Sequence, residues 1–416
     1  MKTGRLFSLT KDERGVAAIV VALGLFMLLG FGALAIDLSH IYVARNELKN
    51  ATDAGALAGA RFLYNREDGT VDTGANQRAC DAARDNRSEN VVVEVNCGQT
   101  ADGVERGHWS FSTRVFTRSN STAPVDLWNR SWAELDADPN FINAVRVTAR
   151  REATQIASYF ATLFGYTGFR QSRDAVAYIG FAGTLEPQDV DQPIALCKQA
   201  LLQTGEYTCS IGRMINSGSN VESHETGGWT DFNQDNPCQG GTNARDVRDL
   251  VCGSGNPRPI ILGQDMATNG GAIQTAFSRL MTCWQNTTGR TQPWTLTLPV
   301  IDCPDNNVGT CERVVGAVTV NIVWINDRTD PHYNNAPTEM AAVPTGYGAW
   351  SSSDPSGQNR WNSFVAHFHL QNVDGTPAPY GPPSIYFLPD CTPHEPRGVT
   401  GGDNFGILAE IPVLVQ

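Results

Sequence analysis

Three oxygen-bearing side chains at alternate positions, Asp231, Asn233 and Asp235, form the pattern in this chain that is best suited to holding a cation. Carboxylate and amide oxygens at this spacing open a calcium-binding loop. A complete loop has glycine at its sixth position and glutamate at its twelfth, where this chain has Asn236 and Thr242. Because an Asx-rich turn explains the same residues, we interpret them as weak metal candidates.

Two histidines, His367 and His369, alternate on a predicted strand and would face the same way. Such a pair can bind a metal, but no third ligand is evident, so packed or surface histidines are the simpler interpretation. The chain contains no His-Glu-x-x-His, no Gly-x-Ser-x-Gly and no P-loop. A Ser-x-x-Lys match at Ser8 and Lys11 lies in a short tail and is interpreted as chance. We expect neither enzymatic activity nor a cofactor.

Aromatic side chains offer a route to sugar binding, because an indole ring can stack on a sugar face. Trp229 and Trp284 are the candidates in the Cys-rich part of the chain. The alternative is that these tryptophans belong to the core, as is more common in a β-rich protein.

The ten cysteines all follow the apolar N-terminal segment, and their even number predicts disulfides in an oxidising compartment. No Cys-x-x-Cys occurs, and the spacings do not match zinc sites. Sequence-local pairs are the simplest guesses, namely Cys80–Cys97, Cys197–Cys209 and Cys238–Cys252. The disulfide candidates are Cys80, Cys97, Cys197, Cys209, Cys238, Cys252, Cys283, Cys303, Cys311 and Cys391.

An uncharged apolar run at residues 16–36 predicts a transmembrane helix. At about 1.5 Å per residue it reaches roughly 32 Å, enough for a hydrocarbon core of about 30 Å. The preceding tail, residues 1–15, is basic, so the positive-inside rule predicts a cytoplasmic N-terminus and an exported remainder. A cleaved signal peptide is the alternative, but its apolar region spans only about 7–15 residues.

A prepilin leader cut after Gly15 is a further possibility, since a charged tail, a glycine and an apolar helix follow one another in that order. Pilins usually carry Glu five residues past the cut, where this chain has Val20. Cleavage at Gly15 therefore lacks that support.

The helical pattern continues beyond the membrane segment to residue 63. Ala51, Gly55 and Gly59 recur every four residues and form a helix-packing face. Glycine inside a helix costs about 1 kcal/mol relative to alanine, so a close partner is expected there. That partner is either the protein's own sheet or another helix in an assembly.

The fold class predicted for the exported part is α+β. Residues 37–184 would form a pilin-like helix-on-sheet domain, and residues 185–416 a disulfide-rich, β-rich domain. Helices are predicted at residues 77–88, 154–164, 245–252 and 272–284. Strands are predicted at residues 91–96, 108–116, 144–150, 175–182, 258–262, 296–301, 317–325, 364–371, 384–388 and 407–415. The formal net charge of −12, without a basic stripe, disfavours nucleic-acid binding.

The segment around the membrane boundary resembles the N-terminal region of the TadG-like family of Flp (tight-adherence) pilus-assembly proteins. The residues in the expected order are Asp37, Tyr42, Arg45, Leu48, Ala51, Asp53, Ala54 and Ala56. Residues 143–148 and 174–177 look like the same family's continuation. Some relatives carry a metal-binding Asp-x-Ser-x-Ser, but here Asp37 and Ser39 are followed by Ile41, so that adhesion chemistry is not expected.

The resemblance implies an inner-membrane, single-pass envelope protein that acts as a pilin-like structural or assembly component. Its expected partners are pilus or pilus-assembly proteins, and membrane lipid through residues 16–36. Its exported domains would be periplasmic or surface-exposed. The alternative function is an envelope adhesin, in which residues 185–416 bind a glycan.

Overall fold

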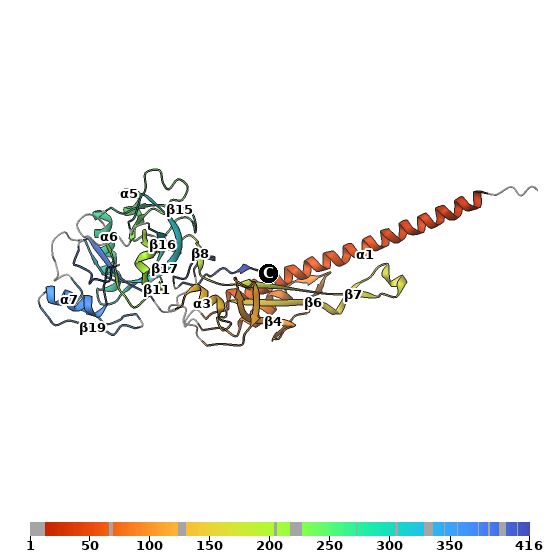
Figure 1. Cartoon of the computed structure of the whole chain (residues 1–416), viewed down its shortest axis with the longest axis horizontal. Coiled ribbons are helices and arrows are strands. Elements are labelled where there is room, and N and C mark those ends of the chain that lie inside the picture. Colours follow the sequence, from red (N-terminus) through yellow and green to blue (C-terminus); the bar gives the residue numbers. More distant parts are fainter. Residues whose placement is uncertain are drawn as a thin grey trace, which may run out of the picture.

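The computed structural model consists of one long helix that projects from the first of two folded lobes (Figure 1). The α+β class expected from the sequence, with one long apolar N-terminal helix, is confirmed. The structure describes residues 13–65, 70–123, 130–203, 206–216, 227–271, 273–303, 307–327, 336–344, 346–355, 357–372, 374–381, 383–390, 397–405 and 407–416.

Helix α1 (Glu13–Arg61) runs without a break through the predicted membrane segment into the folded domain. The large apolar side chains of residues 16–36 are all exposed, whereas Leu48, Ala51 and Ala56 are fully buried. Among the described residues, α1 is the one helix long and apolar enough to cross a membrane. The N-terminal half of α1 therefore exposes apolar side chains on all its sides, whereas its C-terminal half is part of the core.

The first lobe is a six-stranded sheet that packs against α1 and the shorter helix α2 (Ala75–Arg84). Its two longest strands pair as an antiparallel hairpin that extends beside α1 toward the exposed end (Figure 1). The strands in spatial order are β22 (Val413–Leu414), β7 (Gly168–Tyr178), β6 (Ala144–Ala157), β4 (Gly103–Ser110) and β3 (Asn96–Gln99), and β5 (Val115–Arg118) pairs with β4.

The helix-packing face of α1 meets the chain's own α2 and sheet. A Cβ added to Gly55 would lie 2.8 Å from the Ala79 carbonyl oxygen. A Cβ added to Gly59 would lie 2.7 Å from the Ala79 Cβ and 2.8 Å from Val145 Cγ1. Real side chains do not approach so closely, so glycine lets the backbones pack here. Ala51, on the same face, is fully buried.

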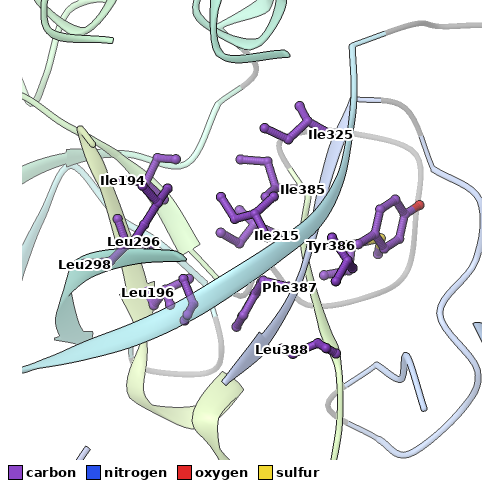
Figure 2. Close-up of a cluster of buried hydrophobic side chains, with 14 of the residues drawn as sticks. Ile194, Leu196, Ile215, Leu296, Leu298, Ile325, Ile385, Tyr386, Phe387 and Leu388 are labelled. Atoms are coloured by element: carbon purple, nitrogen blue, oxygen red, sulfur yellow. The ribbon is translucent and has the colours of Figure 1, made fainter. Parts of the chain in front are cut away.

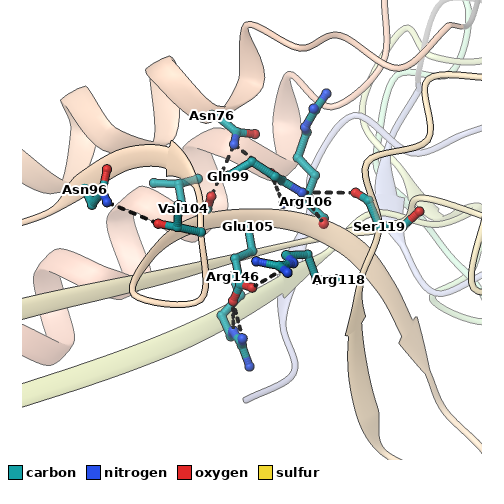
Figure 3. A network of polar contacts seen from close by, with 10 residues as sticks. Asn76, Asn96, Gln99, Val104, Glu105, Arg106, Arg118, Ser119 and Arg146 are labelled. Atoms are coloured by element: carbon teal, nitrogen blue, oxygen red, sulfur yellow. Dashed lines mark hydrogen bonds and ion pairs between the residues drawn. The ribbon is translucent and has the colours of Figure 1, made fainter.

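A network of hydrogen bonds and ion pairs connects strands β3, β4 and β6 with helix α2 (Figure 3). Gln99 accepts a hydrogen bond from the Arg106 backbone amide and donates one to the Arg106 carbonyl oxygen, both at 2.8 Å. Asn76 of α2 donates to the same Gln99 side-chain oxygen at 2.8 Å. Next along β4, the buried Glu105 carboxylate accepts from Arg146 Nε of β6 at 2.6 Å. These bonds link α2 and three strands.

The second lobe is built around a seven-stranded sheet. In spatial order its strands are β12 (Arg213–Asn216), β20 (Ser384–Pro389), β17 (Cys311–Asn326), β15 (Asp265–Asn269), β13 (Gly227–Thr230), β9 (Ile194–Cys197) and β16 (Trp294–Asp302). Because β16 also pairs with β17, five of these strands close into a ring. Aliphatic and aromatic side chains such as Leu298, Ile325 and Phe387 fill its core (Figure 2).

Shorter elements surround these two sheets. The helices are α3 (Trp132–Ala137), η1 (Ala161–Phe164), α4 (Lys198–Leu201), α5 (Ala244–Leu250), α6 (Gln274–Thr288) and α7 (Gly357–His367). The strands are β1 (Arg87–Ser88), β2 (Val91–Val92), β8 (Ala182–Leu185), β10 (Leu202–Gln203), β11 (Glu206–Tyr207), β14 (Ile260–Ile261), β18 (Glu339–Met340), β19 (Trp350–Ser351) and β21 (Val399–Thr400).

The C-terminal segment returns from the second lobe to the first. Strand β21 pairs with β8, and β22 pairs with β7 at the edge of the first sheet. Glu410 forms an ion pair with Arg61 at the end of α1, at 2.5 Å. The strand predicted at residues 407–415 is thus short, and the predicted division at residue 185 stays a prediction.

One of the three guessed disulfides is confirmed, and two are wrong. Cys80–Cys97 joins α2 to β3. The guesses Cys197–Cys209 and Cys238–Cys252 fail because the tertiary structure brings together cysteines that are more distant in sequence. Strands β9 and β16 pair in parallel with Cys197 opposite Ile301, which places Cys303 nearby. The described bridges of the second lobe are Cys197–Cys303, Cys238–Cys311 and Cys252–Cys283.

The long loops closed by these bridges matter for stability. A bridge across a separation of 106 residues, as in Cys197–Cys303, stabilises by about 5 kcal/mol in the chain-entropy model. The Cys80–Cys97 loop would contribute about 3 kcal/mol. Cys209 is also disulfide-bonded, and Cys391 lies outside the described residues.

Three secondary-structure predictions are wrong. The predicted strand 108–116 is instead the end of β4, a turn and the start of β5, because the two strands fold back and pair with each other. The predicted helix 154–164 is instead the end of β6, a bend and η1, because Ile156 pairs across the hairpin with Phe169. The predicted strand 364–371 begins inside helix α7. Phe364 and Phe368 fit both a period of two and a helical spacing of four, and tertiary packing on Trp350 selects the helix.

We predict that Gly59→Leu destabilises the first lobe. The added atoms would overlap Ala79 and Val145, and overpacking costs about 1–3 kcal/mol. Thermal unfolding of the detergent-solubilised protein should show a lower midpoint. Gly30→Leu is the matched control, because a Cβ at that position would meet nothing within 4 Å apart from the adjoining backbone of α1. Equal midpoints for both variants would show that the glycine contact is not needed.

Candidate functional site

The candidate site is the junction where α1 leaves its exposed apolar segment and meets the tip of the β6–β7 hairpin. Asp37 of α1 is the central residue and is only 4% exposed. Its carboxylate accepts hydrogen bonds from the backbone amides of Tyr159 at 2.9 Å, Phe160 at 3.1 Å and Ala161 at 2.7 Å. The Ser158 hydroxyl adds a fourth donor at 3.3 Å. One side chain thus fixes residues 158–161, the first part of the connection between the two strands.

The chemistry of this contact resembles the capping of a helix by a carboxylate. The amides that donate to Asp37 belong to the first residue of the single turn η1 and the two residues before it, where a helix leaves its amides without an internal partner. Desolvation raises the pKa of Asp37, but the hydrogen bonds from Tyr159, Ala161 and Phe160 together outweigh it. They hold the pKa below its ordinary value of 3.8. The carboxylate is therefore charged at neutral pH, where charge-assisted hydrogen bonds are strongest.

A second carboxylate braces the same hairpin farther from its tip. Glu94 accepts hydrogen bonds from the amides of Glu152, Ala153 and Thr154, and from the Thr154 hydroxyl. These residues form the irregular part of β6, where the pairing with β7 is interrupted. Desolvation raises the pKa of Glu94, but the bonds from Thr154 and its neighbours lower it to about 2.

Charged and aromatic groups complete the junction beside Asp37. His40, one turn along α1, lies against the Glu89 carboxylate and places its Nδ1 3.3 Å from the Ala157 carbonyl oxygen. Its ring also packs on Tyr159, with 4.9 Å between centroids. The buried Arg151 of β6 approaches Glu89 at 3.8 Å. The loop at Glu89, the helix and the hairpin therefore meet through one polar cluster.

The other predicted metal and ligand residues do not gather at this junction. Asp231 accepts from the Asn233 amide at 3.1 Å, and the Asn233 side chain accepts from the Asp235 amide at 3.0 Å. Asp235 pairs with Arg258 at 2.8 Å. These are the contacts of an Asx-rich turn. A metal bound by Asp231, Asn233 and Asp235 stays a prediction, and the turn explains their contacts without one.

The predicted histidine and tryptophan candidates also take up ordinary structural positions. His367 ends α7 and bonds to the Gly348 carbonyl oxygen at 2.7 Å, while His369 bonds to that of Ser210 at 3.2 Å. Trp229 and Trp284 are 2% and 0% exposed. Neither indole ring is accessible for stacking on a glycan.

One further group of potential metal ligands occurs among the described residues. Cys238, Asp265 and Cys311 place one ligand atom each within 4.8 Å of one another. The two sulfurs are joined in the Cys238–Cys311 disulfide, so they do not act as thiolate ligands.

Comparison with protein families assigns the part of the chain that contains this junction. Residues 15–61 match the family described as Flp pilus-assembly TadE/G-like. Residues 58–177 match the family described as Tad-like Flp pilus-assembly. Residues 15–177 belong to the TadG-like Flp pilus-assembly family. This membership gives the protein a role related to pilus assembly. No curated protein and no solved structure matches the chain.

The TadG-like motif residues have distinct places in the fold. Leu48, Ala51 and Ala56 are buried against the first sheet and α2, whereas Tyr42 is exposed. Asp37 is the motif residue that reaches the hairpin. Gly15 lies in the first turn of α1, and its cleavage stays a prediction.

Sequence reasoning placed Asp37 in the motif but gave it no partner. The turn at residues 158–161 was missed because it fell inside a predicted helix. The signal that could have found it is a lone acidic residue directly after an apolar run, with no Lys or Arg within one helical turn.

We predict that Asp37→Asn loosens the hairpin tip. The neutral amide offers one acceptor oxygen in place of two charged ones, so amides 159–161 should exchange with deuterium on the order of tenfold faster. Hydrogen-exchange mass spectrometry at pH 7 measures this. Asp53→Asn is the control, because the half-buried Asp53 pairs with Lys49 on the same helix, about four turns from the hairpin tip.

The same contacts predict an acid dependence. Since the pKa of Asp37 is lowered in the folded protein, its stabilisation is complete above the ordinary value of 3.8 and is lost as pH falls through the lowered pKa. Glu94 behaves alike, between its ordinary 4.5 and about 2. Tip protection, corrected for intrinsic exchange, should therefore be equal at pH 7 and pH 5. A loss already at pH 5 would contradict this assignment.

Proposed function

We propose that the protein is a membrane-anchored, pilin-like structural or assembly component of a Flp-type pilus. It acts by helix packing and protein–protein contact. Residues 16–36 cross the inner membrane once, residues 1–15 remain in the cytoplasm, and both lobes lie outside it. The partners are other pilus or pilus-assembly proteins, together with membrane lipid around α1.

The observation that carries this proposal is the division of α1 into two halves. Its first half exposes an uninterrupted apolar surface that is long and apolar enough to cross a membrane. Its second half is the buried spine of a sheet domain. A helix that is half in the membrane and half in a soluble domain is the plan of a pilin. The disulfides of the second lobe fit an oxidising compartment.

The surface available for contact with neighbouring subunits is not the glycine face, because the chain's own α2 and β6 cover Gly55 and Gly59. Just beyond the membrane segment, Leu38 is 56% exposed and Tyr42 is 63% exposed. They are four residues apart and share one helix face. We assign the inter-subunit helix contact to this Leu38–Tyr42 face.

We predict a periplasmic C-terminus. Alkaline phosphatase fused after Gln416 should be active, and a green fluorescent protein at the same place should stay dark. Protein sequencing should find a mature N-terminus no later than residue 16. Fluorescence in the cytosol, or a mature chain that begins after Ile36, would contradict the anchored topology.

We also predict that Leu38→Arg with Tyr42→Arg lowers recovery of membrane complexes about fivefold or more, as expected when interface anchors are replaced. Pull-down from solubilised membranes measures this. Ile261→Arg is the matched control, since Ile261 is also an exposed apolar side chain but lies in the second lobe. Equal recovery of the unaltered protein, the double variant and the Ile261→Arg control would exclude the Leu38–Tyr42 face as a contact surface.

A further inference from the structure

The tip of the β6–β7 hairpin exposes an unusual group of apolar side chains. Leu163 and Phe164 are 81% and 78% exposed. Tyr159, Phe160 and Tyr166 are also exposed and lie on the same turn. Large apolar side chains gathered at a protruding turn indicate a surface that is covered in the working protein.

The tip lies at the level where α1 leaves its bare apolar segment (Figure 1). Tyr159 lines a shallow groove together with Ile36, Ser39 and Val43 of α1. The amides of the turn are fixed to Asp37, the residue that directly follows the apolar run. The exposed side chains are therefore held beside the last turns of the membrane segment.

The composition of the tip matches the boundary of a bilayer. Residues 153–169 contain no charged side chain, and the exposed Arg170 follows directly. Tyrosine and other amphipathic aromatic rings are enriched at the level of lipid headgroups, and phenylalanine and leucine insert into the acyl boundary. An arginine beside them is placed to meet anionic headgroups.

We propose that the hairpin tip inserts into the outer boundary of the same membrane that α1 spans. The protein would then hold the bilayer at two points, the helix and the β6–β7 turn, with Asp37 fixing the distance between them. Because the helix and the turn would both contact the bilayer, the tilt of α1 relative to the membrane would be restricted. The direction in which the two lobes project from the membrane would then be fixed. This inference rests on the proposed membrane anchoring.

Fluorescence quenching in lipid tests the inference on the full chain. The protein is reconstituted in nanodiscs of phosphatidylethanolamine and phosphatidylglycerol, with and without bromine on the acyl chains near the headgroup. The emission that Phe164→Trp adds is measured as the difference from the unaltered chain. This added emission should fall by about half in brominated lipid. Val115→Trp, at an exposed apolar position of β5, is the matched control and should keep its emission.

A third variant separates this inference from the anchoring on which it rests. Phe26→Trp lies within the apolar segment of α1 and should be quenched by bromine placed deep in the acyl chains. Quenching at position 26 without quenching at position 164 would overturn the hairpin insertion alone. No quenching at either position would overturn the anchoring itself. A photo-crosslinker at position 164 that captures a second copy of the chain, and no lipid, would likewise overturn the insertion.

Discussion

The structure depends on one constraint, which is that α1 joins an exposed apolar half to a buried half without a break in its backbone. If the exposed half spans a bilayer, as we propose, every backbone amide and carbonyl group there needs an internal partner, so the helix cannot end inside the membrane. Ending the helix just outside would expose four carbonyl groups and require a cap. The chain instead continues the helix into the first lobe, where its second half becomes the spine of the core.

That solution determines how the first lobe is built. A straight helix packs closely on a sheet and a second helix only where its side chains are small, which explains Gly55 and Gly59 opposite Ala79. The hairpin of β6 and β7 then runs back along α1 and needs an attachment at its free end. Asp37 supplies it with an acceptor for three successive amides, and Glu94 supplies a second one at the irregular part of β6.

The second lobe relies on a different source of stability. Its sheet closes partly into a ring, and disulfides connect segments that are distant in sequence. The C-terminal segment then pairs with β7 and contacts the end of α1. The second lobe is therefore attached to the first lobe at its start, where the chain leaves β7, and again at its end, through β22. This double attachment suits a protein whose proposed role is to present surfaces at a fixed distance from a membrane.

Much of this was accessible from the sequence because it depends on local pattern. The apolar run at residues 16–36, the continuation of α1, the family motif around Asp37, and strands such as β16 and β17 follow from composition and periodicity. Contacts between residues that are distant in sequence could not be predicted from it. Cys197 finds Cys303 only because β9 and β16 pair in parallel. Ambiguous segments such as residues 364–371 were resolved by packing on Trp350.

The same division holds for the candidate site. The sequence by itself determined that an acidic residue follows the apolar run and that aromatic residues gather near position 160. It also determined the length of the apolar run and the spacing of the small residues on α1. Only the tertiary structure decided that the small residues meet the chain's own α2 and sheet, and that Asp37 holds the turn at residues 158–161. The Asp37 contacts join residues more than 100 positions apart, and no local preference specifies such a pairing.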